Sequence, residues 1–61
     1  MMKPDEVNIE EVVDTLFAAR GHVVDAEMAI EDFESVSGCI LSTRKAISRL
    51  EKVLSELEAG N

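Results

Sequence analysis

The sequence predicts an all-α fold: an antiparallel helical hairpin that pairs with a second copy to form a four-helix bundle. Apolar residues recur in steps of three and four from Ile9 to Phe33 and again from Ile40 to Leu57, which is the period of an amphipathic helix. A short segment of Ser and Gly separates these stretches, and no long stretch alternates apolar and polar residues as a strand does. With 61 residues, the chain is expected to form one small domain spanning residues 1–61.

The first helix is predicted to span about residues 8–35. Asn8 is a favoured N-cap residue, and Glu11 follows it by three positions, as in a capping box. Residues 1–7 are expected to form a frayed lead, because Pro4 disfavours a helix interior and the neighbouring acids keep the segment solvated. The apolar seam of this helix consists of Ile9, Val12, Leu16, Ala19, Val23, Ala26, Ile30 and Phe33.

Gly21 leaves a second architecture open. Glycine inside a helix costs about 1 kcal/mol relative to alanine, and glycine often ends a helix instead. A break at Gly21 would turn the chain into a three-helix bundle. The seam passes through Gly21 without a change of phase, which favours one long helix.

The second helix is predicted at about residues 39–58, after a turn at about residues 36–38. Gly38 can adopt the positive φ that a helix exit requires, and Ser37 can cap the helix that follows. Ala46 and Val53 broaden the apolar stripe of this helix. Its seam consists of Ile40, Thr43, Ile47, Leu50, Leu54 and Leu57.

These boundaries make the first helix longer than the second, so that its N-terminal part has no partner within the hairpin. That part is the most apolar of the chain, and something must cover it. A homodimer, a kink at Gly21 and a complex with a different protein are the three solutions, and we favour the homodimer. The expected dimer or partner interface consists of Ile9, Val12, Val13, Leu16, Phe17, Val23 and Val24.

The charge of the chain limits the classes of partner. Its formal net charge is -7, whereas nucleic-acid binding requires clustered cations, so nucleic acid is an unexpected partner. No apolar run is long enough to span a membrane and no signal peptide is recognised, which indicates a cytoplasmic protein without a membrane contact. Most acids precede the turn, and they are expected either to pair with Arg44, Lys45 and Arg49 or to form an acidic docking face. This face consists of Glu27, Glu31, Asp32 and Glu34.

The sequence offers little chemistry to a catalytic, metal or cofactor site. His22 and Cys39 are the one histidine and the one cysteine, and the predicted helix register separates them. His22 is expected to flank the seam, with a pH-dependent interface as the alternative. Cys39 is expected to be a small buried apolar residue, with a reactive thiol as the alternative. No enzyme activity, metal or cofactor is therefore expected.

These features predict a small acidic protein-interaction factor, a regulator or inhibitor that binds and masks another protein. One alternative is a structural or chaperone-like subunit of a complex with a different protein. Another is an RNA-binding dimer, which requires a basic stripe formed by Arg44, Lys45, Arg49 and Lys52. A third is an acidic mimic of nucleic acid.

Overall fold

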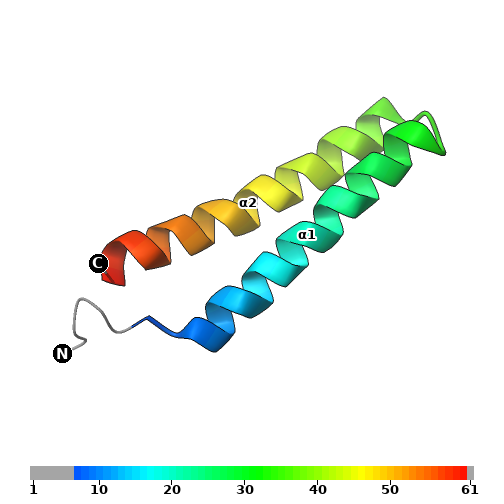
Figure 1. Cartoon of the computed structure of the whole chain (residues 1–61). Helices are drawn as coiled ribbons and strands as arrows, with labels where there is room; N and C mark the ends of the chain where they lie inside the picture. The colour runs from blue at the N-terminus through cyan, green and yellow to red at the C-terminus, as the bar shows by residue number, and fades with distance from the viewer. Residues whose placement is uncertain (1–6, 61) are drawn as a thin grey trace.

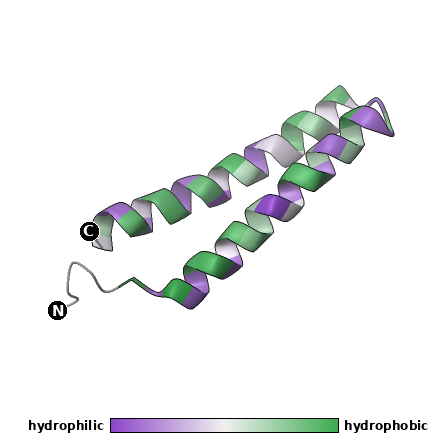
Figure 2. Ribbon diagram, in the orientation of Figure 1, coloured by the Kyte–Doolittle hydropathy of each residue, from purple (hydrophilic) through white to green (hydrophobic). Residues whose placement is uncertain are grey.

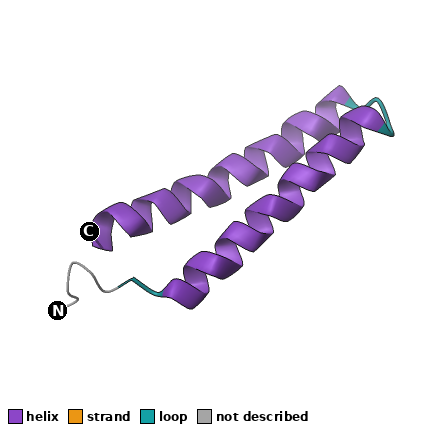
Figure 3. Ribbon diagram, viewed as in Figure 1, coloured by secondary structure: helices purple, strands orange, loops and turns teal. Residues whose placement is uncertain are grey.

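The computed structural model describes residues 7–60 and contains two helices, α1 (Ile9–Glu31) and α2 (Val36–Gly60). The helices lie side by side and run antiparallel, so that the start of α1 and the end of α2 lie at the same end of the molecule (Figure 1). Within the described residues the chain consists of helix and connecting loop (Figure 3). The predicted helical hairpin is confirmed. Of the predicted lead at residues 1–7, residues 1–6 lie outside the described part of the chain.

The start of α1 agrees with the sequence-based prediction. Asn8 is the N-cap, and its side-chain oxygen accepts a hydrogen bond of 3.1 Å from the backbone amide of Glu11. This bond satisfies one of the backbone donors that a helix leaves free at its N-terminus. Gly21 lies inside the continuous α1, so the alternative three-helix bundle broken at this residue is wrong.

The end of α1 differs from the prediction, because the helix ends at Glu31 and not near residue 35. The backbone amide of Asp32 donates to the carbonyl of Met28 at 2.8 Å, and that of Ser35 donates to the carbonyl of Ala29 at 2.8 Å. Glu34 adopts a φ of 49°, which is the left-handed conformation of a helix exit. The residue predicted to adopt this conformation was Gly38, and that prediction is wrong.

The start of α2 also differs from the prediction, because the helix begins at Val36 and not near residue 39. The turn itself begins about four residues earlier than predicted. Ser35 rather than Ser37 caps the helix, and its side-chain oxygen accepts a hydrogen bond of 3.0 Å from the backbone amide of Gly38. A Cβ atom at Gly38 would lie 2.8 Å from the Ser35 Oγ and 3.5 Å from the Ala29 Cβ. The close approach of the Ser35 side chain therefore favours glycine at position 38, and a positive φ does not.

The earlier turn makes the two helices almost equal in length, with 23 residues in α1 and 25 in α2. Glu11, near the start of α1, lies beside Lys52, with 3.7 Å between Oε1 and Nζ. Val12 is buried in this part of α1, and Val53 is buried in the facing part of α2. The predicted overhang of α1 is therefore absent, because α2 accompanies α1 to its first turn.

The contact between the helices is made mainly by small side chains. The buried residues of α1 include Val12, Ala19 and Ala26, which follow one another at intervals of seven residues. In α2, Ala46, Val53 and Gly60 are buried at the same interval. A seven-residue repeat keeps these positions on one side of each helix, and small side chains there let two helix backbones approach closely. Among the described residues, the apolar side chains that the hairpin buries are thus two valines and three alanines.

Candidate protein-interaction surface

The large apolar side chains lie mostly outside the helix contact. Figure 2 shows hydrophobic segments along the whole length of both helices. Eleven of the exposed large residues, each between 41% and 66% exposed, define a surface that we call the open apolar face. It consists of Ile9, Val13, Leu16, Val23 and Ile30 in α1, and of Val36, Ile40, Ile47, Leu50, Leu54 and Leu57 in α2.

Helical geometry places these residues on one side of the hairpin. In α1, Ile9, Leu16 and Val23 each precede a buried contact residue by three positions. In α2, Leu50 and Leu57 precede buried contact residues by the same three positions. A residue three positions before a contact residue lies about 60° around the helix axis from that contact. The direction of this rotation, viewed along the chain, is the same in both helices. Because the helices are antiparallel, equal offsets from the contact lead to the same side of the pair.

The size and shape of the molecule show how much surface this arrangement leaves exposed. The chain exposes 4913 Å², whereas a compact protein of 6.7 kDa is expected to expose about 3,900 Å². The radius of gyration of the Cα atoms is 14.3 Å, whereas a compact domain of this length has about 10.5 Å. Both differences reflect the elongated shape of the hairpin, whose extents are 48 × 16 × 12 Å.

The residues predicted from the sequence as an interface divide into three groups. Four of them, Ile9, Val13, Leu16 and Val23, belong to the open apolar face. Val12 is 7% exposed and belongs to the contact within the hairpin. Phe17 and Val24 are exposed, but their place in the helical period puts them on the side of α1 that faces away from α2.

The α2 half of the open apolar face was not predicted as an interface. The sequence-based seam of α2 assigned Ile40, Ile47, Leu50, Leu54 and Leu57 to the contact with the first helix, but all five are exposed. Ala46 and Val53, which were assigned to the flank of that seam, form the contact instead. The small residues at seven-residue intervals are the signal that could have identified the true contact.

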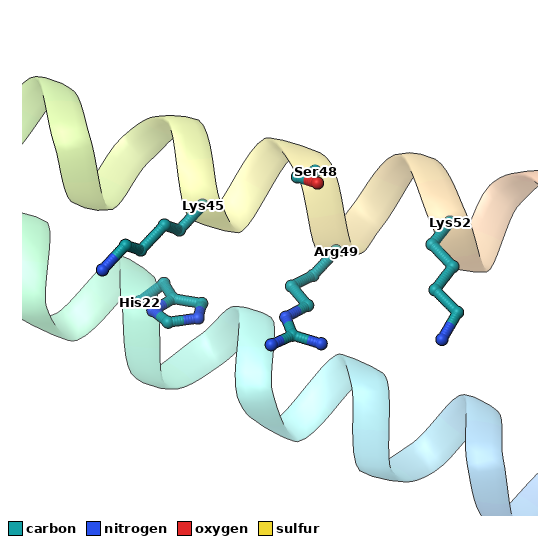
Figure 4. Close-up of a pocket in the computed structure, with 5 residues that line it drawn as sticks. All are labelled: His22, Lys45, Ser48, Arg49 and Lys52. Carbon is teal, nitrogen blue, oxygen red and sulfur yellow. The ribbon is translucent and has the colours of Figure 1, made fainter.

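The opposite side of the hairpin is polar and holds a shallow hollow. His22 of α1 and Lys45, Ser48, Arg49 and Lys52 of α2 line this hollow. The side chains of Lys45, Arg49 and Lys52 extend from α2 towards α1 (Figure 4). The structure thus brings together three of the four cations of the predicted basic stripe. Arg44 does not line the hollow.

The predicted acidic docking face lies near the turn. Glu27 and Glu31 belong to the last turns of α1, Asp32 and Glu34 belong to the connection, and all four are exposed. Their predicted pairing with Arg44, Lys45 and Arg49 does not occur, since the ion pair of Lys52 with Glu11 is the only one within residues 7–60. The earlier turn shifts Lys45 and Arg49 towards His22, in the middle of α1.

Few other groups offer chemistry. Cys39 is a half-buried free thiol with its Sγ 4.0 Å from the Oγ1 of Thr43. Among residues 7–60, His, Cys and acidic side chains do not gather in groups of three that could hold a metal ion. Neither α1 nor α2 has an apolar stretch sufficient to cross a membrane. Comparisons of the chain with protein-family models, with curated proteins and with solved structures find no match.

Proposed function

We propose that the protein is a non-enzymatic interaction factor that works as a homodimer and binds and masks another protein. The open apolar face is the observation that carries this proposal. The hairpin buries five apolar side chains, and three of these are alanines. Full burial of one large apolar side chain contributes about 1.5–3 kcal/mol, and the eleven side chains of the open apolar face are each 41–66% exposed, so covering them adds part of this amount at each position.

A second copy of the chain is a suitable cover, because the face is long, straight and formed by both helices. Two hairpins that place these faces together form a four-helix bundle with an apolar core. The seven-residue interval of Ile9, Leu16, Val23 and Ile30 is the repeat by which helices in such bundles interdigitate. A twofold axis uses the same surface of both copies, so a single face suffices for a closed dimer.

The test is the absolute mass of the protein in solution, measured by light scattering with refractive-index detection because the chain has no Trp or Tyr. We expect a mass near twice the 6.7 kDa of one chain. Leu54→Glu places a charge on the open apolar face and should give a monomer with reduced helicity. Leu41→Glu is the matched control, since Leu41 is 57% exposed and lies outside this face.

Two results would contradict the homodimer. One is a fully helical wild-type monomer, which would mean that the hairpin is stable with its apolar face in water. The other is an equal loss of mass in the Leu41→Glu and Leu54→Glu variants. A monomeric, partly folded wild-type chain would instead favour the structural subunit, whose face is covered by a different protein.

An RNA-binding dimer is the second candidate, because Lys45, Arg49 and Lys52 line one hollow. The net charge of -7 and the pairing of Lys52 with Glu11 weaken it. A gel shift at low salt separates the two functions, since phosphate contacts are strongest there. Retention of RNA that is lost in a Lys45→Glu/Arg49→Glu variant would support the second candidate.

A further inference from the structure

The outer side of α1 carries a second, smaller apolar stripe. Phe17, Gly21, Val24 and Met28 follow one another by four, three and four positions, so they lie on one side of the helix. Phe17 is 73% exposed, and Val24 and Met28 are each 45% exposed. This side of α1 faces away from α2, and a dimer formed through the open apolar face would leave it accessible. We call these four residues the outer stripe.

A hollow interrupts the outer stripe at Gly21. Phe17, Arg20, Gly21, Val24 and Asp25 line it. A Cβ atom at Gly21 would meet no atom within 4 Å, and no described glycine has a positive φ. Neither packing within the hairpin nor backbone conformation therefore requires glycine here. The residue nevertheless costs the helix about 1 kcal/mol relative to alanine.

The charges around the outer stripe indicate the chemistry of its partner. Glu10 and Asp14 continue the stripe towards the start of α1, and Glu31 continues it towards the end. Asp25 and Arg20 line the hollow, and Glu11, which pairs with Lys52 of α2, does not belong to this surface. A partner that matches this surface presents apolar side chains along its centre and basic side chains along its edges.

We propose that the outer stripe is the target-binding site and that it binds a basic amphipathic helix. An apolar side chain of that helix occupies the hollow over Gly21, between Phe17 and Val24. Its lysines and arginines lie near the acids at the two ends of the stripe. This inference deepens the proposed function and rests on it, since the homodimer is what leaves α1 with one outer apolar surface for a second protein.

The test measures binding of a fluorescein-labelled synthetic peptide of about 20 residues, with leucine and lysine at helical spacing, by fluorescence anisotropy. Gly21→Leu fills the hollow without a change of charge and should weaken binding by about tenfold or more. Ser55→Leu is the matched control, because it adds the same side chain at an exposed position of α2. It should bind as the wild type does. A peptide of equal composition in scrambled order should bind more weakly.

Two outcomes would overturn the inference. Equal affinity of the Gly21→Leu and Ser55→Leu variants would show that the hollow has no role. Equal affinity of the ordered and scrambled peptides would show that the acids attract cations without recognising a helix. The mass of each variant separates this failure from failure of the proposed function. If the protein is a dimer but the compared variants or peptides bind equally, only the outer stripe is excluded as the target-binding site. If the protein is a monomer and Leu54→Glu abolishes peptide binding, the peptide binds the open apolar face instead.

Discussion

Glu34 is the residue at which the turn departs most from ordinary backbone geometry. Its φ of 49° lies in the left-handed region, which costs a residue with a Cβ atom about 1–2 kcal/mol. Ser35, the next residue, accepts the hydrogen bond that starts α2, so the conformation of Glu34 sets where the second helix begins. A glutamate is an unusual choice for this position, because glycine adopts the same conformation without the steric cost.

Replacing Glu34 with glycine should therefore stabilise the hairpin. We expect the free energy of unfolding to rise by about 0.5–1 kcal/mol, which is less than the strain removed because glycine also has more freedom in the unfolded chain. Thermal unfolding followed by circular dichroism at one chain concentration measures the change. Glu34→Ala is the control, since it removes the same carboxylate without removing the Cβ atom. An equal shift of the unfolding midpoint in Glu34→Gly and Glu34→Ala would show that loss of the carboxylate, and not loss of the Cβ atom, causes the stabilisation.

At the scale of the helices, the contact between α1 and α2 depends on small side chains. Ala19 and Ala46 are 2% and 3% exposed, which makes them the most buried residues with side chains in the hairpin. A larger side chain at either position is expected to push the helices apart, because both positions are almost completely covered.

Ala46→Leu should lower the free energy of unfolding by about 1–3 kcal/mol, the usual cost of overpacking. Ser55→Leu adds the same side chain at an exposed position of α2 and should change it little. Denaturant unfolding of both variants measures the difference. A stabilised Ala46→Leu variant would contradict a close contact between α1 and α2 at Ala46, because the larger side chain would then fit without separating the helices.

The helices and the first cap could be predicted from the sequence, whereas the pairing of helix faces could not. Apolar periodicity shows which side of a helix avoids water, and it led to the correct number and order of helices. It does not show which neighbour covers that side, so Leu50 and Leu54 were assigned to the wrong contact. The turn was misplaced because Ser35 and Ser37 are equally good caps by residue type, and the structure uses Ser35.

The candidate site was predictable only in part, because apolar periodicity does not show which neighbour covers an apolar side. Ile9, Val13, Leu16 and Val23 were predicted to form an interface as part of an overhang of the first helix, and the structure has no such overhang. They are exposed because Ala19 and Ala26 take the position against α2. The open apolar face extends over both helices, and recognising it requires the register of the pair, which the sequence does not show directly.

For the whole molecule, the proposed dimer makes stability depend on the concentration of the chain. When folding and association are coupled, mass action favours the associated state at higher concentration. Raising the chain concentration tenfold should therefore raise the midpoint of thermal unfolding by several degrees, roughly as expected for about 1 kcal/mol in a small domain. Circular dichroism in cells of different path length measures this shift. A midpoint that stays constant would indicate that the hairpin unfolds as a single chain.

The small side chains between α1 and α2 have a consequence for how such a sequence can change over time. The residues that hold the hairpin together and the large apolar residues available to other surfaces are different sets, on different sides of the helices. Exchange of one large apolar residue for another can alter what the hairpin associates with, while the small residues keep the same helix pairing. Substitutions among Ala19, Ala26 and Ala46 alter the pairing itself. This division lets one hairpin acquire new partners through its exposed residues without first redesigning its fold.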